Sequence, residues 1–124
     1  MTTRTANRRK TRRYSVSHKE DTWIEFEYPR PNGRTFRFSL VDISVSGFSF
    51  ALDEDSPPLE SGSDVAGVTI QVGDCSLHGD LLVLHVSPTS ATRSVCGALF
   101  YPADDTELVK LKSVVAGVSA AQGG

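Results

Sequence analysis

Residues 23–40 read WIEFEYPRPNGRTFRFSL. Apolar and polar residues alternate in both halves of this segment, and a period of two is typical of β-strands with one buried face. The residues between the halves favour a turn, because Asn32-Gly33 suits the positive φ angles of a tight hairpin. The segment therefore predicts a β-hairpin. Its core-facing residues are expected to be Ile24, Phe26, Tyr28, Phe36, Phe38 and Leu40.

Similar alternation continues beyond the hairpin. It predicts further strands at residues 48–52, 68–72, 76–86 and 95–100, and Gly73-Asp74 offers a second hairpin turn. Residues 81–84 are apolar at every position, which favours a strand covered on both faces. Six strands at short intervals predict a mostly β protein, either a barrel or a sandwich.

The period changes near the C-terminal end of the sequence. Asp104 is followed three residues later by Glu107, which resembles the start of a capped helix, and Leu108, Leu111 and Val115 follow with helical spacing. We expect one amphipathic helix against the sheet. Residues 116–124 are small and polar, and they predict a flexible tail.

Charge is distributed unevenly along the 124 residues. Six of the 13 Lys and Arg residues lie in the first 13 positions, which contain no Asp or Glu. The rest of the chain has seven basic residues against all 15 acidic ones, a net charge of −8. A basic arm on an acidic body indicates that the arm binds an anion.

Several functional classes are not supported by the sequence. Residues 81–84 form the longest strongly apolar run, too short to cross a bilayer, and the N-terminus has no apolar stretch typical of export, so we expect a cytoplasmic protein. Cys75 and Cys96 lack metal-ligand spacing, and we predict no metal site. Ser44 has no neighbouring base in sequence, and there is no nucleotide-binding glycine fingerprint, so we expect no enzyme activity and no cofactor.

Two short motifs remain: an arginine cluster at residues 8–13, and Asp42-Ile43-Ser44-Val45-Ser46-Gly47. In this order they read R-x-x-x-R and D-x-S-x-x-G, and a late Gly97-x-x-Phe100 precedes the predicted helix. The chain thus resembles the PilZ family over residues 8–115. The resemblance implies a six-stranded antiparallel Greek-key barrel, a C-terminal helix and a flexible basic N-terminal arm, with residues 1–7 as a disordered tail. It also implies a receptor for the bacterial second messenger cyclic di-GMP.

The arginine motif fits the sequence in two registers. Arg9 and Arg13 have the required spacing, and so do Arg8 and Arg12. We prefer Arg9 and Arg13, because similar domains begin a strand directly after the second arginine and Tyr14 follows Arg13. The pair is then implied to contact phosphate and guanine, since a guanidinium binds phosphate oxygens in pairs and stacks on purines. Arg8 would precede the motif, a position that in similar domains goes with an intercalated ligand dimer and two ligands per protein.

The second motif is implied to recognise guanine. The Asp42 carboxylate is expected to accept two hydrogen bonds from guanine N1 and N2. Ser44 would add a hydroxyl contact, and Gly47 would supply either a positive φ or the absence of a side chain beneath the ligand. Arg12 and Gly97 are further candidate ligand contacts, Gly97 because its strand allows another backbone to approach closely.

Two alternatives stay open. The basic arm also fits a nucleic-acid-binding β-barrel, although the acidic body makes nucleic acid a poorer ligand than a phosphorylated small molecule. A PilZ-like adaptor that binds no ligand is the other alternative, and both intact motifs argue against it. In the preferred reading, the bound messenger orders the arm and changes the surface offered to an unidentified downstream protein.

Overall fold

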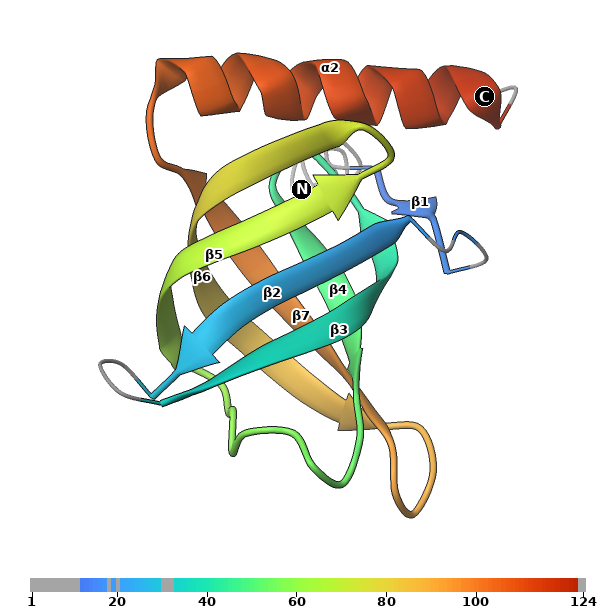
Figure 1. Cartoon of the computed structure of the whole chain (residues 1–124). Coiled ribbons are helices and arrows are strands. Elements are labelled where there is room, and N and C mark those ends of the chain that lie inside the picture. Colours follow the sequence, from blue (N-terminus) through green and yellow to red (C-terminus); the bar gives the residue numbers. More distant parts are fainter. Residues whose placement is uncertain (1–11, 18, 20, 30–32, 123–124) are drawn as a thin grey trace, which may run out of the picture.

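The computed structural model describes residues 12–17, 19, 21–29 and 33–122. In these ranges the chain forms seven strands followed by a long helix (Figure 1). The elements are β1 Tyr14–Ser15, β2 Thr22–Tyr28, β3 Arg34–Ile43, β4 Gly47–Leu52, β5 Asp64–Val72, β6 Cys75–Pro88, β7 Ser94–Pro102 and α2 Asp105–Ala121.

The strands form a closed antiparallel barrel. Six of them pair in the order β3-β2-β5-β6-β7-β4, and pairing between β4 and β3 closes the ring. The short β1 adds to β3 beside the end of β2. The connection from β4 to β5 joins strands that are not neighbours, as a Greek key requires. The predicted six-stranded barrel is confirmed, with one extra strand.

The β2–β3 hairpin supplies much of the core. Phe26 lies opposite Phe36, and Ile24 lies opposite Phe38. The rings of Phe26, Phe38 and Phe50 meet inside the barrel, with centroids 5.6–6.1 Å apart. Tyr28 and Phe36 are only half-buried against this core. Residues 30–32 of the predicted turn lie outside the described residues.

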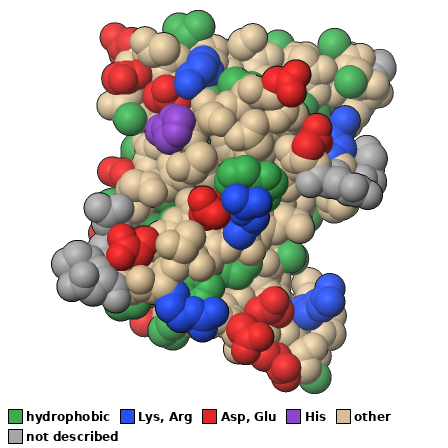
Figure 2. Space-filling model, in the orientation of Figure 1, with side chains coloured by type: hydrophobic (Ala, Val, Ile, Leu, Met, Phe, Trp, Pro, Cys, Tyr) green, Lys and Arg blue, Asp and Glu red, His purple; other side chains and the backbone are tan. Residues whose placement is uncertain are grey.

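Polar and charged side chains cover the outside of the hairpin. Figure 2 shows both signs of charge scattered over the face formed by β2, β3 and β5. On the outer side of β2 and β3, the Arg37 guanidinium lies 3.8 Å from the centre of the Trp23 ring, and its Nη2 lies 3.1 Å from Glu25 Oε2. Strands β4 and β7 lie behind β2 and β3 in Figure 1.

Strand β6 differs from the prediction that it is covered on both faces. Leu81 and Val83 are buried in the barrel, but Leu84 is 42% exposed. Alternation from the buried Leu81 and Val83 already directs Leu84 outward, and the shift in the β6–β7 pairing between Val83 and His85 leaves Leu84 as the unpaired residue of a β-bulge. Residues 81–84 are thus apolar at every position although only one face of the strand lies in the core.

Helix α2 lies across one end of the barrel (Figure 1). Its predicted start is confirmed, because the side chain of Asp104 accepts a hydrogen bond of 3.0 Å from the Glu107 N–H. The helix also includes residues 116–121, which the sequence predicted as a flexible tail, and buried Val118 explains this difference. No helix in the described ranges has the length and hydrophobicity needed to span a membrane.

The first turn of α2 is held to β6 by a charged cluster. The helical spacing predicted that Leu108 faces the sheet, but Leu108 is 37% exposed and its neighbour Glu107 is buried instead. The Glu107 carboxylate accepts hydrogen bonds from the His78 N–H at 2.7 Å and lies 2.9 Å from Lys110 Nζ. Lys110 also donates to the Ser76 carbonyl at 2.8 Å. Burial alone would raise the pKa of Glu107, but these hydrogen bonds and the attraction of the nearby cations hold it below its ordinary value.

This cluster should make stability depend on pH. Because the folded-state pKa of Glu107 is lowered, its stabilising contribution is present above the unfolded-state pKa and is lost as pH falls through the folded-state value. We expect Glu107→Gln to reduce the free energy of unfolding at pH 7 by about 1–2 kcal/mol, with the difference shrinking towards pH 3. Urea unfolding of both proteins from pH 7 to pH 3 measures this. A difference that is constant over the whole range would contradict the assignment.

Candidate ligand-binding site

The turn between β3 and β4 is held by one hydroxyl group. The Ser44 hydroxyl accepts hydrogen bonds from the N–H groups of Ser46 and Gly47, both at 3.2 Å. The Ser44 N–H donates to the Gly47 carbonyl at 2.9 Å, which closes the turn. Ser44 is 3% exposed. Its hydrogen-bonding capacity is thus directed into the turn, and its side chain fixes the loop shape next to Asp42.

Gly47 begins β4 where two strands come very close. A Cβ atom at this position would collide with the carbonyl oxygen of Ala98 on β7. The φ angle of Gly47 lies outside the left-handed region. Of the two reasons that the sequence offered for this glycine, the absence of a side chain therefore applies, and the neighbour that requires it is the backbone of β7.

Asp42 lies on β3 just before this turn. Its side chain is one-quarter exposed, and Oδ1 lies 3.7 Å from Nη1 of Arg13. The approach follows from β1, in which Ser15 pairs directly with Asp42 and Tyr14 pairs with Ile43. The extra strand thus brings the end of the basic arm to the second motif, although the two are far apart in sequence.

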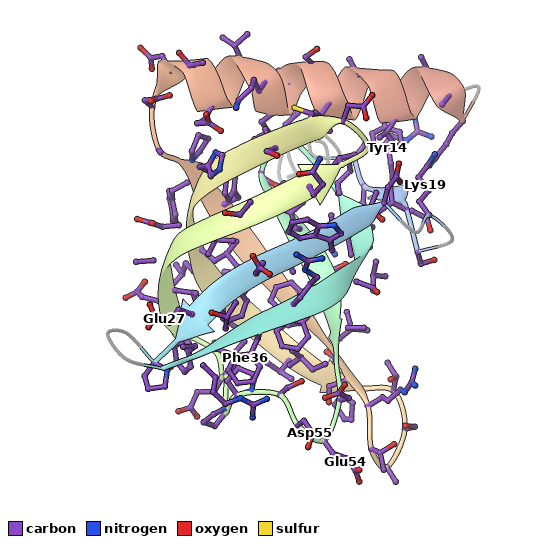
Figure 3. All side chains as sticks on the ribbon, in the orientation of Figure 1. Tyr14, Lys19, Glu27, Phe36, Glu54 and Asp55 are labelled. Carbon is purple, nitrogen blue, oxygen red and sulfur yellow. The ribbon has the colours of Figure 1, made fainter. Side chains whose placement is uncertain are left out.

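The two described arginines of the arm point to different neighbours. Arg13 contacts Asp42, whereas the Arg12 guanidinium lies 6.0 Å from the centre of the Tyr14 ring. The register that pairs Arg9 with Arg13 stays a prediction, because Arg8 and Arg9 lie outside the described residues. Tyr14 lies close to the C-terminal end of α2 in Figure 3, at the end of the barrel opposite Glu54 and Asp55.

The pairing of β3, β4 and β7 places Gly97 on the same side of the barrel as the β3–β4 turn. It pairs with Ser49 on β4, and Ser49 in turn pairs with Asp42 on β3. Gly97 therefore lies two strands away from Asp42 and is buried. The sequence predicted that another backbone approaches Gly97, but the close neighbour is a side chain, because a Cβ atom here would lie 2.6 Å from Nε2 of His85 on β6.

One hollow in the barrel surface is lined by acidic residues and does not suit an anion. It has a volume of about 260 Å³ and lies between the ends of β2 and β5. Its lining includes the carboxylates of Glu27 and Asp64. Glu27 lies at the far end of β2 from Tyr14 (Figure 3). Two carboxylates would repel a phosphate, so this hollow does not suit a phosphorylated ligand.

Several solved structures have the same arrangement of strands and helix. The PilZ domain of YcgR from Escherichia coli, solved with c-di-GMP, matches with a TM-score of 0.75 over 93% of this chain and 94% of that chain, at 19% identity. The chain has the PilZ fold. MrkH of K. pneumonia, solved as a c-di-GMP complex, matches with a TM-score of 0.80 and 14% identity over 93% of this chain. The chain spans 54% of that MrkH structure.

The PilZ fold is also shared with a protein described as an inhibitor of motility. This protein, MotI/DgrA of Bacillus subtilis, matches with a TM-score of 0.66 and 12% identity, covering 90% of this chain and 52% of that one. No family model and no curated protein sequence matches the chain. The predicted likeness to PilZ domains is thus confirmed at the level of the fold.

Proposed function

We propose that this chain is a receptor module for cyclic di-GMP. The observation that carries the proposal is the meeting of Arg13 and Asp42, 3.7 Å apart, on a PilZ fold. Each of these residues belongs to one of the two motifs, and together they offer a cation for phosphate and a carboxylate for guanine. The c-di-GMP complexes of YcgR and MrkH, which share the fold, support this ligand.

The proposed contacts divide the ligand between the two motifs. Guanine presents adjacent N–H donors at N1 and N2, and the Asp42 carboxylate can accept both. The separation of 3.7 Å from Arg13 is an ion pair longer than a hydrogen bond, so it leaves lone pairs of Asp42 for the base. Arg9 and Arg13 would hold the phosphodiesters and stack on guanine. Arg12 remains a lesser candidate for the same contacts.

The remaining motif residues would act mainly through shape. Ser44, with its hydroxyl bonded inside the turn, would position Asp42, and Gly47 would let β4 lie against β7. Arg8 would favour an intercalated dimer of the ligand and hence two ligands per protein. Binding would order the arm on the barrel and change the surface offered to a downstream protein, with no chemical reaction.

Calorimetric titration of the whole chain with cyclic di-GMP tests the proposal. We expect saturable binding that is weakened by Arg9→Ala and by Arg13→Ala, because each removes a charged contact with the ligand. Arg37→Ala removes the same charge from the outer face of β3, where Arg37 lies over Trp23, and should bind like the parent. Absence of binding by the parent protein would end the proposal, and saturation at one ligand per protein would exclude the intercalated dimer.

The two alternative functions give different results in the same experiment. Tight binding of a single-stranded oligonucleotide, with steep salt dependence, would favour the nucleic-acid-binding barrel over the receptor. A folded protein that binds neither ligand would favour the adaptor. The net charge of −8 outside the arm makes the first of these the weaker alternative.

A further inference from the structure

Strands β3 and β4 separate towards the end of the barrel that lies away from α2 (Figure 1). Their pairing ends where Leu40 lies opposite Phe50. Beyond this point, β3 extends to Arg34 with β2 on its other side, and β4 extends to Leu52 with β7 on its other side. Within the described residues, the facing edges of these two segments have no partner strand. The barrel is therefore closed at one end of β3 and split at the other.

A hollow of about 210 Å³ occupies this split. Phe38 and Ser39 line it on the β3 side, and Ala51 and Leu52 line it on the β4 side. Phe38 and Leu52 are buried, whereas Ser39 is exposed, so the hollow has an apolar floor and a polar rim. The unpaired part of β3, residues 34–39, is about 20 Å long, which is enough for a strand of about six residues to lie along it.

The backbone of residues 34–39 offers hydrogen bonds to the split. The N–H and C=O groups of successive strand residues point alternately to the two edges, so every second residue directs its groups away from β2 and into the split. An open edge of this kind is a template for an added strand. A partner that uses it must be extended and must supply backbone groups of its own. Its side chains would alternate as those of β3 do, one set over the apolar floor and the other on the outside.

The charge of the open edge indicates which strands it accepts. Residues 34–39 contain two arginines and no carboxylate. The Arg34 guanidinium lies 4.8 Å from the centre of the Phe36 ring, and Arg37 lies on the outer face. The ion pair of Arg37 with Glu25 is exposed and therefore weak, so its guanidinium can bind a second carboxylate. An acidic strand is thus favoured over a basic one.

The β4 side of the split adds little charge to this edge. Asp53 lines the hollow, but its carboxylate accepts a hydrogen bond of 2.9 Å from the Asp55 N–H and is held in its own turn. Arg93 lines the hollow too, and it shares a neighbouring hollow with Glu54 and Asp55. Their carboxylates offset its charge. Arg37 is therefore the main charge beside the open edge.

The same charges disfavour two other occupants. The N-terminal arm of the chain holds six of the 13 Lys and Arg residues, so the edge would repel it. A second copy that paired its own β3 antiparallel about Arg37 would place two Arg37 side chains directly opposite each other, and like charges in that position are destabilising.

We propose that the open edge of β3, residues 34–39, binds an extended acidic segment of a partner protein by strand addition. Apolar side chains of the added strand would lie over Phe36, Phe38 and Leu52, and acidic ones would lie outside beside Arg37. The partner is therefore a segment of alternating apolar and acidic residues. This surface lies at the opposite end of β3 from Asp42, and its use does not require cyclic di-GMP.

A synthetic peptide tests the charge preference. The probe is a capped eight-residue peptide of alternating Val and Glu, and the control peptide has Lys in place of Glu. Titration followed by NMR gives the affinity of the whole chain for each. We expect saturable binding of the Glu peptide and at least about tenfold weaker binding of the Lys peptide, because the latter places cations beside Arg37. No binding of the Glu peptide, or equal binding of both, would overturn the proposal.

Amide hydrogen exchange tests the backbone pairing. Within residues 35–39, the amides that face β2 should exchange slowly in the free protein, and the alternate ones should exchange fast. Saturating Glu peptide should slow the second set by about tenfold, because those N–H groups gain partners. Binding that leaves the alternate pattern unchanged would mean that the peptide contacts side chains only. The same protection without peptide, together with dimerisation of the protein, would assign the edge to a second copy.

Two N-methylated forms of the Glu peptide give a matched pair. Methylation at every Val nitrogen removes one alternate set of N–H groups, and methylation at every Glu nitrogen removes the other set. An added strand uses one edge to pair with β3, so one form should lose affinity more than tenfold while the other binds within about threefold of the parent peptide. Equal affinity of the two methylated peptides would contradict strand addition.

Protein variants separate this inference from the proposed function. Arg37→Glu should weaken binding of the Glu peptide about tenfold and leave cyclic di-GMP binding unchanged. Lys112→Glu makes the same charge change on an exposed position of α2 and should bind both like the parent. If cyclic di-GMP binds and the Glu peptide does not, the receptor proposal stands and the open-edge proposal fails. If the peptide binds and cyclic di-GMP does not, the reverse holds.

Discussion

Replacing Asp42 with alanine is expected to lower the affinity for cyclic di-GMP about ten- to a hundredfold, since a bidentate contact with a base edge is worth about 1–3 kcal/mol. Folding should change little, because the side chain is one-quarter exposed and its Arg13 partner lies 3.7 Å away in an exposed ion pair. Calorimetric titration gives the affinity, and thermal unfolding of the ligand-free protein confirms that the fold is intact.

Two further variants separate the effects of charge and shape at Asp42. Asp55→Ala removes the same charge from the loop at the opposite end of the barrel (Figure 3) and should bind like the parent. Asp42→Asn keeps the shape, but its amide offers one acceptor and one donor group where guanine needs two acceptors, so its affinity should also fall. Unchanged affinity in Asp42→Ala would show that the guanine edge is read elsewhere.

Adding a single methyl group at Gly47 should damage both folding and binding. The Cβ atom of Gly47→Ala would collide with the Ala98 carbonyl oxygen, and paired backbones cannot move aside as a flexible side chain can. We expect the free energy of unfolding to fall by about 1–3 kcal/mol. Because Gly47 also closes the turn that Ser44 holds, the shift should weaken ligand binding even under conditions in which the variant is fully folded.

Gly117→Ala is the matched control for Gly47→Ala. Gly117 lies within α2, and a Cβ atom there would meet nothing within 4 Å. Alanine should therefore stabilise the helix, by about 0.5–1 kcal/mol, and leave affinity unchanged. Urea unfolding of the two variants should give changes of opposite sign. A neutral Gly47→Ala would mean that β4 and β7 can separate without cost at this point.

Local sequence patterns were sufficient to predict six strands, in a barrel or a sandwich, and the resemblance to the PilZ family favoured the barrel. Alternation over residues 23–40 predicted the β2–β3 hairpin because each strand has one face in the core. The bulge at Leu84 could not be predicted, since it depends on how β6 pairs with β7. The end of α2 was also missed, because the burial of Val118 is a tertiary contact that small neighbouring residues do not reveal.

The candidate site was predicted in part. Asp42 and Arg13 were selected from motif order, and the structure brings them together through β1. Ser44 was expected to touch the ligand, but only the fold shows that its hydroxyl is bonded within the turn. The position of Gly97 two strands away from Asp42 could not be predicted, because it requires the register of two strand pairs.

Strand β1 is also attached to the other end of the described chain. The side-chain amide of Gln122, just after α2, donates a hydrogen bond of 2.7 Å to the carbonyl oxygen of Ser15, the residue that pairs with Asp42. The hydrogen bond therefore ties the C-terminal end of α2 to the strand that lies beside Asp42. The first and last elements of the barrel domain meet next to the candidate site, although more than one hundred residues separate them in sequence.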